Sequence, residues 1–396
     1  MSFLRDPTSL ARRAVLPTLP IVCAILLIVC SRAFSSPDRN SSATSEAQLF
    51  KQAQELTSEG RLRDAAGVYN QIVQLDSGSF AALNNLGVID SHLGDYKGAA
   101  AAYERALSLR PGSFAVLMNL GIAHFKESDF NGAVQPLTRA VALQPQNFQA
   151  LALLSLTQYS AKDFTGACRH LERAVALSPG NPTLEYMLGE SYLRTGQEQK
   201  LVDRFSTMAQ PSATDRMLLG AASDAVGRTQ DAIREFTLAA SSEPDALCVH
   251  FGLGFLYWKE HDDLRAAGQF GLEMEDAGWV PQSEAYLGDI DLRRGKRRES
   301  RAMLEQALRL NPDLSLAHLD LGILDALDKS YGDAAAEFEK TIRLDPKMAE
   351  GYRRLAQVYA AEGKPRLAAS ATAQANSLKG ERPESLAEKA ALIPPP

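Results

Sequence analysis

The sequence predicts an all-α fold, a solenoid of about ten stacked helix-turn-helix repeats. Three observations predict it: a small residue recurs every 34 positions, the apolar residues around it follow helical spacing, and Gly and Pro interrupt the pattern at matching places. The small residues are Gly87, Gly121, Ser155, Gly189, Gly220, Gly254, Gly288, Gly322 and Ala356. Because each repeat of a solenoid contacts mainly its neighbours, the 396 residues need not divide into several globular domains.

Alignment on the small residue gives ten units within residues 46–379, and their starts are spaced by 34 residues except after the fifth unit, which is three residues short. The units begin at Glu46, Phe80, Phe114, Phe148, Pro182, Ala213, Leu247, Pro281, Ser315 and Ala349. The short fifth unit predicts a hinge or a change of superhelical pitch within residues 182–212. The alternative is a harmless deletion in a loop.

The second unit shows the pattern of one repeat. Its apolar positions at Leu83, Leu86 and Gly87 share one face of a first helix, and Ala99, Tyr103 and Ala106 share one face of a second. Gly94-Asp95 breaks the pattern between them. Pro111 ends the second helix because proline lacks an amide donor.

The small residue is expected where the two helices of a unit cross closely, facing an alanine of the second helix. Those alanines are Ala65, Ala99, Ala133, Ala167, Ala232, Ala266, Ala334 and Ala368. A bulky apolar residue follows four positions later and is expected to fill the space between neighbouring units. These residues are Tyr69, Tyr103, Leu137, Leu171, Phe236, Phe270 and Phe338.

These residues carry a family resemblance. The run Leu83-Asn84-Asn85-Leu86-Gly87, with Gly94-Asp95-Tyr96, Ala99, Tyr103, Ala106 and Pro111, resembles the tetratricopeptide repeat. The resemblance covers residues 46–379 and implies a right-handed α-solenoid that binds protein partners. The sequence departs from the family pattern at Leu201 and Pro211 in the fifth unit, Arg297 and Ser300 in the eighth, and Pro365 and Thr372 in the tenth.

The net charge and the cysteines limit the kinds of partner and cross-link that we expect for this protein. A net charge of −6 argues against a nucleic-acid partner, because binding a phosphate backbone needs clustered Lys and Arg. The basic run at residues 293–298 is interpreted as a solvated helix end, with an anion site as the alternative. Cys23 and Cys30 precede the repeats, and Cys168 and Cys248 are predicted to be buried packing residues rather than a disulfide.

The N-terminal segment predicts export. Arg5, Arg12 and Arg13 precede the uncharged residues 14–31, the layout of an export signal. Residues 1–35 are expected to be either a cleaved signal peptide or a retained signal-anchor. Either way the repeats would lie outside the cytoplasm, as a periplasmic, secreted or membrane-anchored protein whose only membrane contact is this segment.

Two further segments flank the repeats. Residues 36–45 are polar and predict a flexible linker. Residues 380–396 predict a short capping helix, with Leu386, Ala390 and Ile393 available to cover the last unit, followed by a proline tail.

The sequence predicts no catalytic residues, no cofactor and no metal site. The six histidines include no pair at ligand spacing on one helix face, and no phosphate-binding loop motif is present. We therefore expect a protein that is not an enzyme and that acts by binding.

The resemblance implies that the second, fifth, ninth and twelfth positions of each unit line a concave groove for a peptide or partner helix. The sixth positions of units two and three are asparagines, which could form hydrogen bonds with the backbone of a bound peptide. The candidate groove residues are Asn85, Met118, Asn119, Ile122, Phe125, Leu156, Tyr159, Tyr186, Leu193, Phe251, Phe255 and Trp258. Phe255 and Trp258 are the predicted anchors, and the alternative is that neighbouring helices bury many of these side chains.

The family's clamp of Lys, Asn and Arg for acidic C-termini is not expected, because its lysines and arginine are missing. The corresponding places hold Phe50, Gln54, Asn85, Ala115 and Asn119. The leading hypothesis is a non-enzymatic scaffold of the bacterial cell envelope that binds partner polypeptides. Two alternatives stay open. One is an accessory module that recruits substrates for a separate enzyme or for a secretion or assembly machine. The other is a self-assembling structural protein that forms homo-oligomers.

Overall fold

The computed structural model describes residues 40–246, 248–275 and 280–378, and all regular structure within them is helical. The chain divides into two compact units, unit 1 up to Ser191 and unit 2 from Tyr192. The predicted signal segment 1–35, residues 36–39 of the predicted linker and the predicted cap 380–396 lie outside the described residues.

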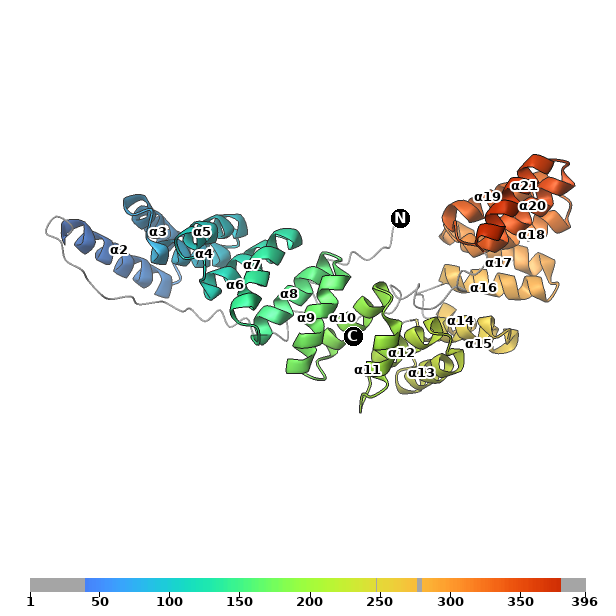
Figure 1. Cartoon of the computed structure of the whole chain (residues 1–396), viewed down its shortest axis with the longest axis horizontal. Helices are drawn as coiled ribbons and strands as arrows, with labels where there is room; N and C mark the ends of the chain where they lie inside the picture. Colours follow the sequence, from blue (N-terminus) through green and yellow to red (C-terminus); the bar gives the residue numbers. More distant parts are fainter. Residues whose placement is uncertain (1–39, 247, 276–279, 379–396) are drawn as a thin grey trace. The chain divides into compact units, whose positions relative to one another are not determined.

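Unit 1 contains four helix pairs, which lie side by side in chain order (Figure 1). The pairs are α2 (Asn40–Ser58) with α3 (Leu62–Leu75), α4 (Phe80–Leu93) with α5 (Tyr96–Leu109), α6 (Phe114–Lys126) with α7 (Phe130–Leu143), and α8 (Phe148–Ser160) with α9 (Phe164–Leu177). Helices α4, α6 and α8 begin at the predicted residues. Helix α2 begins at Asn40, so it includes residues 40–45, which were predicted to be linker.

The division between the units falls inside α10 (Pro182–Arg194), the first helix of the short fifth repeat. Its second helix, α11 (Glu198–Phe205), has 8 residues where α9 has 14, which agrees with the predicted early end before Pro211. The hinge predicted within residues 182–212 stays a prediction.

Unit 2 continues with five more pairs. They are α12 (Ala213–Ala225) with α13 (Thr229–Ser242), α14 (Val249–Lys259) with α15 (Asp263–Glu275), α16 (Val280–Arg293) with α17 (Arg297–Leu310), α18 (Ser315–Leu327) with α19 (Tyr331–Leu344), and α20 (Ala349–Ala361) with α21 (Pro365–Ser377). The first helices begin within two residues of the predicted unit starts. The four pairs of unit 1 and the five pairs of unit 2 confirm the predicted all-α solenoid.

Aspartates begin the second helices of three successive repeats in unit 1. The carboxylates of Asp95, Asp129 and Asp163 each accept a hydrogen bond of 2.9 Å from the backbone N–H of the glycine three residues later. An acceptor at this position satisfies an amide that the helix leaves unbonded, and it typically contributes about 1 kcal/mol. The Gly-Asp break seen in the sequence is therefore a helix start.

The helix crossings differ in one detail from the prediction. A Cβ added to Gly121 would lie 2.4 Å from Leu137, and one added to Gly322 would lie 2.6 Å from Phe338. The small residue thus accommodates the bulky side chain of its own repeat, and not only the alanine one turn earlier. Each such side chain, fully buried, contributes about 1.5–3 kcal/mol.

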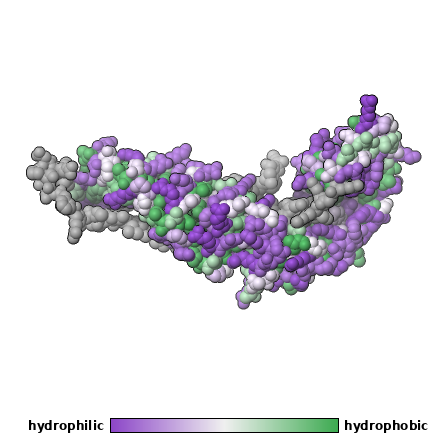
Figure 2. Space-filling model, viewed as in Figure 1, coloured by the Kyte–Doolittle hydropathy of each residue, from purple (hydrophilic) through white to green (hydrophobic). Residues whose placement is uncertain are grey.

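Burial follows the predicted pattern elsewhere. The second-helix alanines from Ala65 to Ala334 have no exposed surface, whereas Ala368 in the last repeat is half-buried. Cys168 and Cys248 are both buried, as predicted. In the view of Figure 2, hydrophilic residues predominate on the visible surface of each unit, and hydrophobic residues form scattered patches.

Asp90 of α4 makes the stability of unit 1 depend on pH. Burial, and to a lesser degree the charge of Asp95, raises the pKa of the Asp90 carboxyl to about 6. Because the folded state binds this proton more tightly than the unfolded state, the stabilisation is present below pH ~4 and is lost as the pH rises through ~6.

We therefore expect Asp90→Asn to flatten the fall in stability between pH ~4 and ~6, and to stabilise the protein at neutral pH by about 1 kcal/mol, allowing for solvent screening at this half-buried site. Urea denaturation at several pH values measures this. Glu104→Gln, at an exposed carboxyl of α5, is the control. An unchanged pH profile in Asp90→Asn would contradict the assignment.

Candidate partner-binding groove

All twelve predicted groove residues lie on first helices, but the structure separates them by exposure. Five are buried, namely Leu156, Tyr186, Leu193, Phe251 and Phe255. Seven are half-buried, namely Asn85, Met118, Asn119, Ile122, Phe125, Tyr159 and Trp258. Only the second set leaves side-chain surface for a partner.

Six of the half-buried residues belong to unit 1, and we call them the unit 1 strip: Asn85, Met118, Asn119, Ile122, Phe125 and Tyr159. They come from α4, α6 and α8, the first helices of three consecutive repeats. Met118, Ile122 and Phe125 are spaced by four and three residues, so they form one row along α6. Beneath the row, Met118 packs on the apolar core of unit 1.

The two asparagines of the strip differ in their hydrogen bonds. The Asn85 side-chain amide donates to the Tyr69 hydroxyl at 3.3 Å and accepts from Asn84 at 3.3 Å. Within the described residues, the Asn119 side chain has no hydrogen-bond partner. An amide offers both donors and an acceptor, so Asn119 can bond both groups of a peptide unit.

The strip ends at a polar contact between repeats. The Tyr159 hydroxyl donates a hydrogen bond to the Glu190 carboxylate of α10. Burial, followed by the charge of Glu190, raises the pKa of Tyr159. The phenol therefore stays protonated and holds α8 to α10, which leaves mainly its ring for a partner.

In unit 2 two predicted groove residues, Phe251 and the predicted anchor Phe255, belong to an aromatic core. Phe251 and Phe255 are 1% and 0% exposed. The ring centroid of Tyr286, from the next first helix, lies 5.9 Å from that of Phe251 and 5.7 Å from that of Phe255. Phe270 stacks on the other face of the cluster, 5.2 Å from Tyr286. This corrects the expectation that Phe255 anchors a guest: neighbouring helices of the repeat stack already bury it.

Trp258 is half-buried, but its indole N–H already forms a hydrogen bond within the protein. The indole N–H donates to Asp289 at 2.5 Å, and the Arg293 guanidinium lies over the ring, 5.6 Å from its centroid. Arg293 also forms ion pairs with Asp289 at 3.1 Å and with Asp263 at 2.8 Å. Arg293, the first residue of the basic run, is thus neutralised by carboxylates. This agrees with the interpretation of the run as a helix end, and Arg293 does not offer an open anion site.

Sequence reasoning missed a row of carboxylates on the first helices of unit 2. Asp224 is 3% exposed and pairs with Lys259 at 2.6 Å, and Asp320 of α18 is 2% exposed. Together with Asp289 of α16 they stand at the twelfth, ninth and sixth positions of their repeats. Two of the three, Asp224 and Asp289, are at predicted groove positions, and because acidic residues are seldom buried without a partner, the sequence held a signal.

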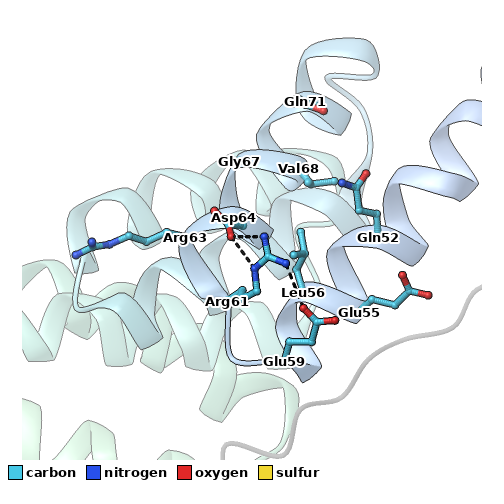
Figure 3. A pocket seen from close by; sticks show the side chains of 10 residues that line it. All are labelled: Gln52, Glu55, Leu56, Glu59, Arg61, Arg63, Asp64, Gly67, Val68 and Gln71. Atoms are coloured by element: carbon cyan, nitrogen blue, oxygen red, sulfur yellow. Dashed lines mark hydrogen bonds and ion pairs between the residues drawn. The ribbon is translucent and has the colours of Figure 1, made fainter.

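One cavity lies in the first repeat, between α2 and α3, with a volume of about 510 Å³. Figure 3 shows that its lining is mainly polar, with Arg61 bonded to Glu59 and Asp64 while Arg63 points away. These three bonded side chains are more than half exposed, so such pairs contribute little to stability or binding. A second cavity, of about 250 Å³, lies between α18, α19 and α20 in unit 2.

Two further observations concern the described residues. No group of three or more His, Cys, Asp and Glu side chains among them is arranged to hold a metal ion. None of their helices combines the length and the apolar character needed to cross a bilayer. The predicted signal segment lies outside the described residues.

Comparison with known proteins agrees with the repeat register. Two models of the tetratricopeptide repeat match the chain, one at residues 50–115 and again at 287–349, the other at 91–157. Repeats of this family are thus found in both units. No curated protein of similar sequence was found.

Three solved structures are among those similar to this chain. A Cut9–Hcn1 hetero-tetramer of the APC/C is 13% identical with a TM-score of 0.46, covering 84% of this chain and 87% of that chain. Yeast Tom70 is 14% identical with a TM-score of 0.39, covering 89% and 95%. MamA from Desulfovibrio magneticus RS-1 is 21% identical with a TM-score of 0.36, covering 41% and 91%.

At these identities and scores the likeness carries no information on partners. The helix pairs, their 34-residue register and the family matches in both units lead to one conclusion. The chain is a tetratricopeptide repeat protein.

Proposed function

We propose that the chain is a non-enzymatic interaction scaffold and that the unit 1 strip binds a segment of a partner polypeptide. The observation that carries the proposal is the row of half-buried apolar side chains on α6 beside Asn119, whose amide has no hydrogen-bond partner among the described residues. An apolar row beside a solvent-accessible amide is suited to a peptide.

The chemistry of the strip defines the guest. Met118, Ile122 and Phe125 would bury apolar side chains of the partner, each contact contributing through area removed from water. Asn119 would bond the partner's main chain, which any sequence provides. The guest is therefore an extended or amphipathic segment with apolar side chains on one face.

A photoactivatable amino acid placed at Ile122 in the full chain tests this proposal. We expect it to cross-link one defined segment of a partner, identified by mass spectrometry. The same probe at Leu143, a 49% exposed residue at the end of α7, is the control for random surface contact. Identical products from both positions would remove the strip from consideration.

We also propose that residues 1–35 direct the protein across the cytoplasmic membrane, so that the repeats act in a bacterial cell envelope. The support is the sequence alone, three arginines followed by an uncharged apolar segment. Cell fractionation, with sequencing of the mature N-terminus, tests the setting and also distinguishes cleavage from anchoring. Recovery of the uncleaved chain in the soluble cytoplasm would contradict this proposal and leave the scaffold proposal intact.

A further inference from the structure

The second helices of unit 1 end in leucines that face solvent. The last residue of each of α3, α5, α7 and α9 is a leucine, and these side chains are between 42% and 69% exposed. They are Leu75, Leu109, Leu143 and Leu177, spaced by 34 residues. A single exposed leucine is ordinary, but apolar side chains exposed at the same place in consecutive repeats are typical of an interaction surface.

The loops that follow three of these leucines lie against one another. The Arg139 guanidinium donates a hydrogen bond of 2.6 Å to the carbonyl of Pro111, and the Arg173 guanidinium donates one of 2.5 Å to the carbonyl of Pro145. Each bond joins the end of one second helix to the loop after the preceding one. Residues 105–116, 139–150 and 173–184 therefore form one continuous border of unit 1, which we call the leucine edge.

The leucine edge carries arginines and no carboxylates. Its charged residues are Arg105, Arg110, Arg139 and Arg173. Arg105 and Arg110 are exposed, and the Arg110 guanidinium lies over the ring of Phe80, 4.2 Å from its centroid. Within the described residues, none of the four arginines forms an ion pair. Their positive charge is therefore available to an anionic partner.

Unit 2 shows that the leucine position alone does not select this partner. Leu310 and Leu344 stand at the same position of their repeats and are 58% and 38% exposed. The loops after them carry Asp313 and Asp345, so the corresponding border of unit 2 includes carboxylates. The opposite border of unit 1 also carries carboxylates, those of the aspartates that begin its second helices. Exposed leucines and unpaired arginines without acidic residues are thus combined on the leucine edge.

This combination fits an anionic lipid surface. Leucines enter the boundary between headgroups and acyl chains, and arginines bind lipid phosphates. A second copy of the chain fits poorly, because arginines would then face arginines. A nucleic acid would use the arginines through its phosphates but would leave the leucines in water.

We propose that the leucine edge rests on an anionic phospholipid membrane, with Leu109, Leu143 and Leu177 at the acyl boundary and Arg105 and Arg110 against lipid phosphates. This contact lies on the bilayer, does not cross it, and is additional to the predicted N-terminal segment. It uses none of the residues of the unit 1 strip, so the strip and the edge are tested separately. Because the occupant of the edge is a lipid, Leu143 keeps its role as the control for cross-linking to proteins.

An environment-sensitive fluorophore at Ala142, an exposed residue beside Leu143, tests the contact in the full chain. In vesicles of phosphatidylglycerol and phosphatidylcholine, we expect spin-labelled lipid to quench it at least about threefold more than in phosphatidylcholine alone, and salt to reduce the difference. The N-terminal segment is present in both experiments and cannot produce this difference. The same fluorophore at Lys97, exposed on the opposite border, should be quenched in neither.

Matched variants test the charge. Arg105→Gln with Arg110→Gln should lower the quenching at Ala142 about tenfold or more, since each arginine near an anionic surface strengthens binding about fivefold. Lys97→Gln with Lys126→Gln removes the same charge from the opposite border and should have no effect.

The leucines are tested in the same way. Leu109→Ser with Leu177→Ser should lower the quenching several-fold, whereas Leu93→Ser, at a 39% exposed leucine of the opposite border, should not. Circular dichroism checks that each variant retains its helices. Quenching that is absent, equal in the two kinds of vesicle, equal on the two borders, or unchanged in either folded edge variant would overturn the proposal.

Discussion

Replacing Phe270 by alanine is expected to lower the free energy of unfolding by about 3–5 kcal/mol, the range for truncating a fully buried phenylalanine. The Phe270 side chain is 0% exposed, and its ring stacks on Tyr286 with an angle of 7° between the planes. It also lies 5.8 Å from Phe251 and against Gly254. Removing the ring leaves a cavity shared by two consecutive repeats, which neither repeat can close alone.

Urea denaturation followed by circular dichroism measures this loss. Leu264→Ala, on the same helix at a residue that is 77% exposed, is the control and should change stability by less than about 0.5 kcal/mol. Equal effects of the two substitutions would show that the aromatic cluster is not the core of unit 2.

Gly252→Ala is expected to destabilise unit 2 by about 1–3 kcal/mol, the usual cost of overpacking a core. An added Cβ would lie 2.2 Å from the Phe236 ring. The ring cannot move away from this Cβ, because its opposite edge already packs against Gly220. An added Cβ at Gly220 would lie only 2.5 Å from the ring. Phe236 is thus held between glycines of two successive first helices.

Gly268→Ala provides the opposite case within the same repeat. Gly268 lies in the exposed part of α15, and nothing stands within 4 Å of its added Cβ. Alanine favours a helix over glycine by about 1 kcal/mol, so this variant should gain stability. Thermal unfolding of both variants measures the contrast, and a loss in both, or in neither, would contradict the helix-crossing account.

The repeat register could be predicted from the sequence because it depends on local rules. Gly87 and Gly121 mark helix crossings, Asp95 marks a helix start, and Pro111 marks an end, whatever the neighbouring repeats contain. The exception is α2, which begins six residues before Glu46. Its first residues are polar, so hydrophobic periodicity could not reveal them.

The groove could be predicted only in part, because exposure depends on the neighbouring repeat. Ile122 and Phe255 occupy the same position of their units, yet Ile122 is half-buried and Phe255 is 0% exposed. The difference is Tyr286, a large ring that the next first helix lays over Phe255. Helix α14 is apolar on every side, a pattern typical of a fully buried helix. That pattern could have indicated from the sequence that Phe255 is buried.

The central claim is that the unit 1 strip, and not the aromatic cluster of unit 2, binds the partner. Its most direct test is the affinity of the purified chain for the partner segment that cross-links to Ile122, measured by isothermal titration calorimetry. The account predicts that Met118→Ser with Ile122→Ser weakens binding by about tenfold or more while the helices remain folded, and that Leu264→Ser has no effect. Unchanged affinity of the folded double variant would contradict it.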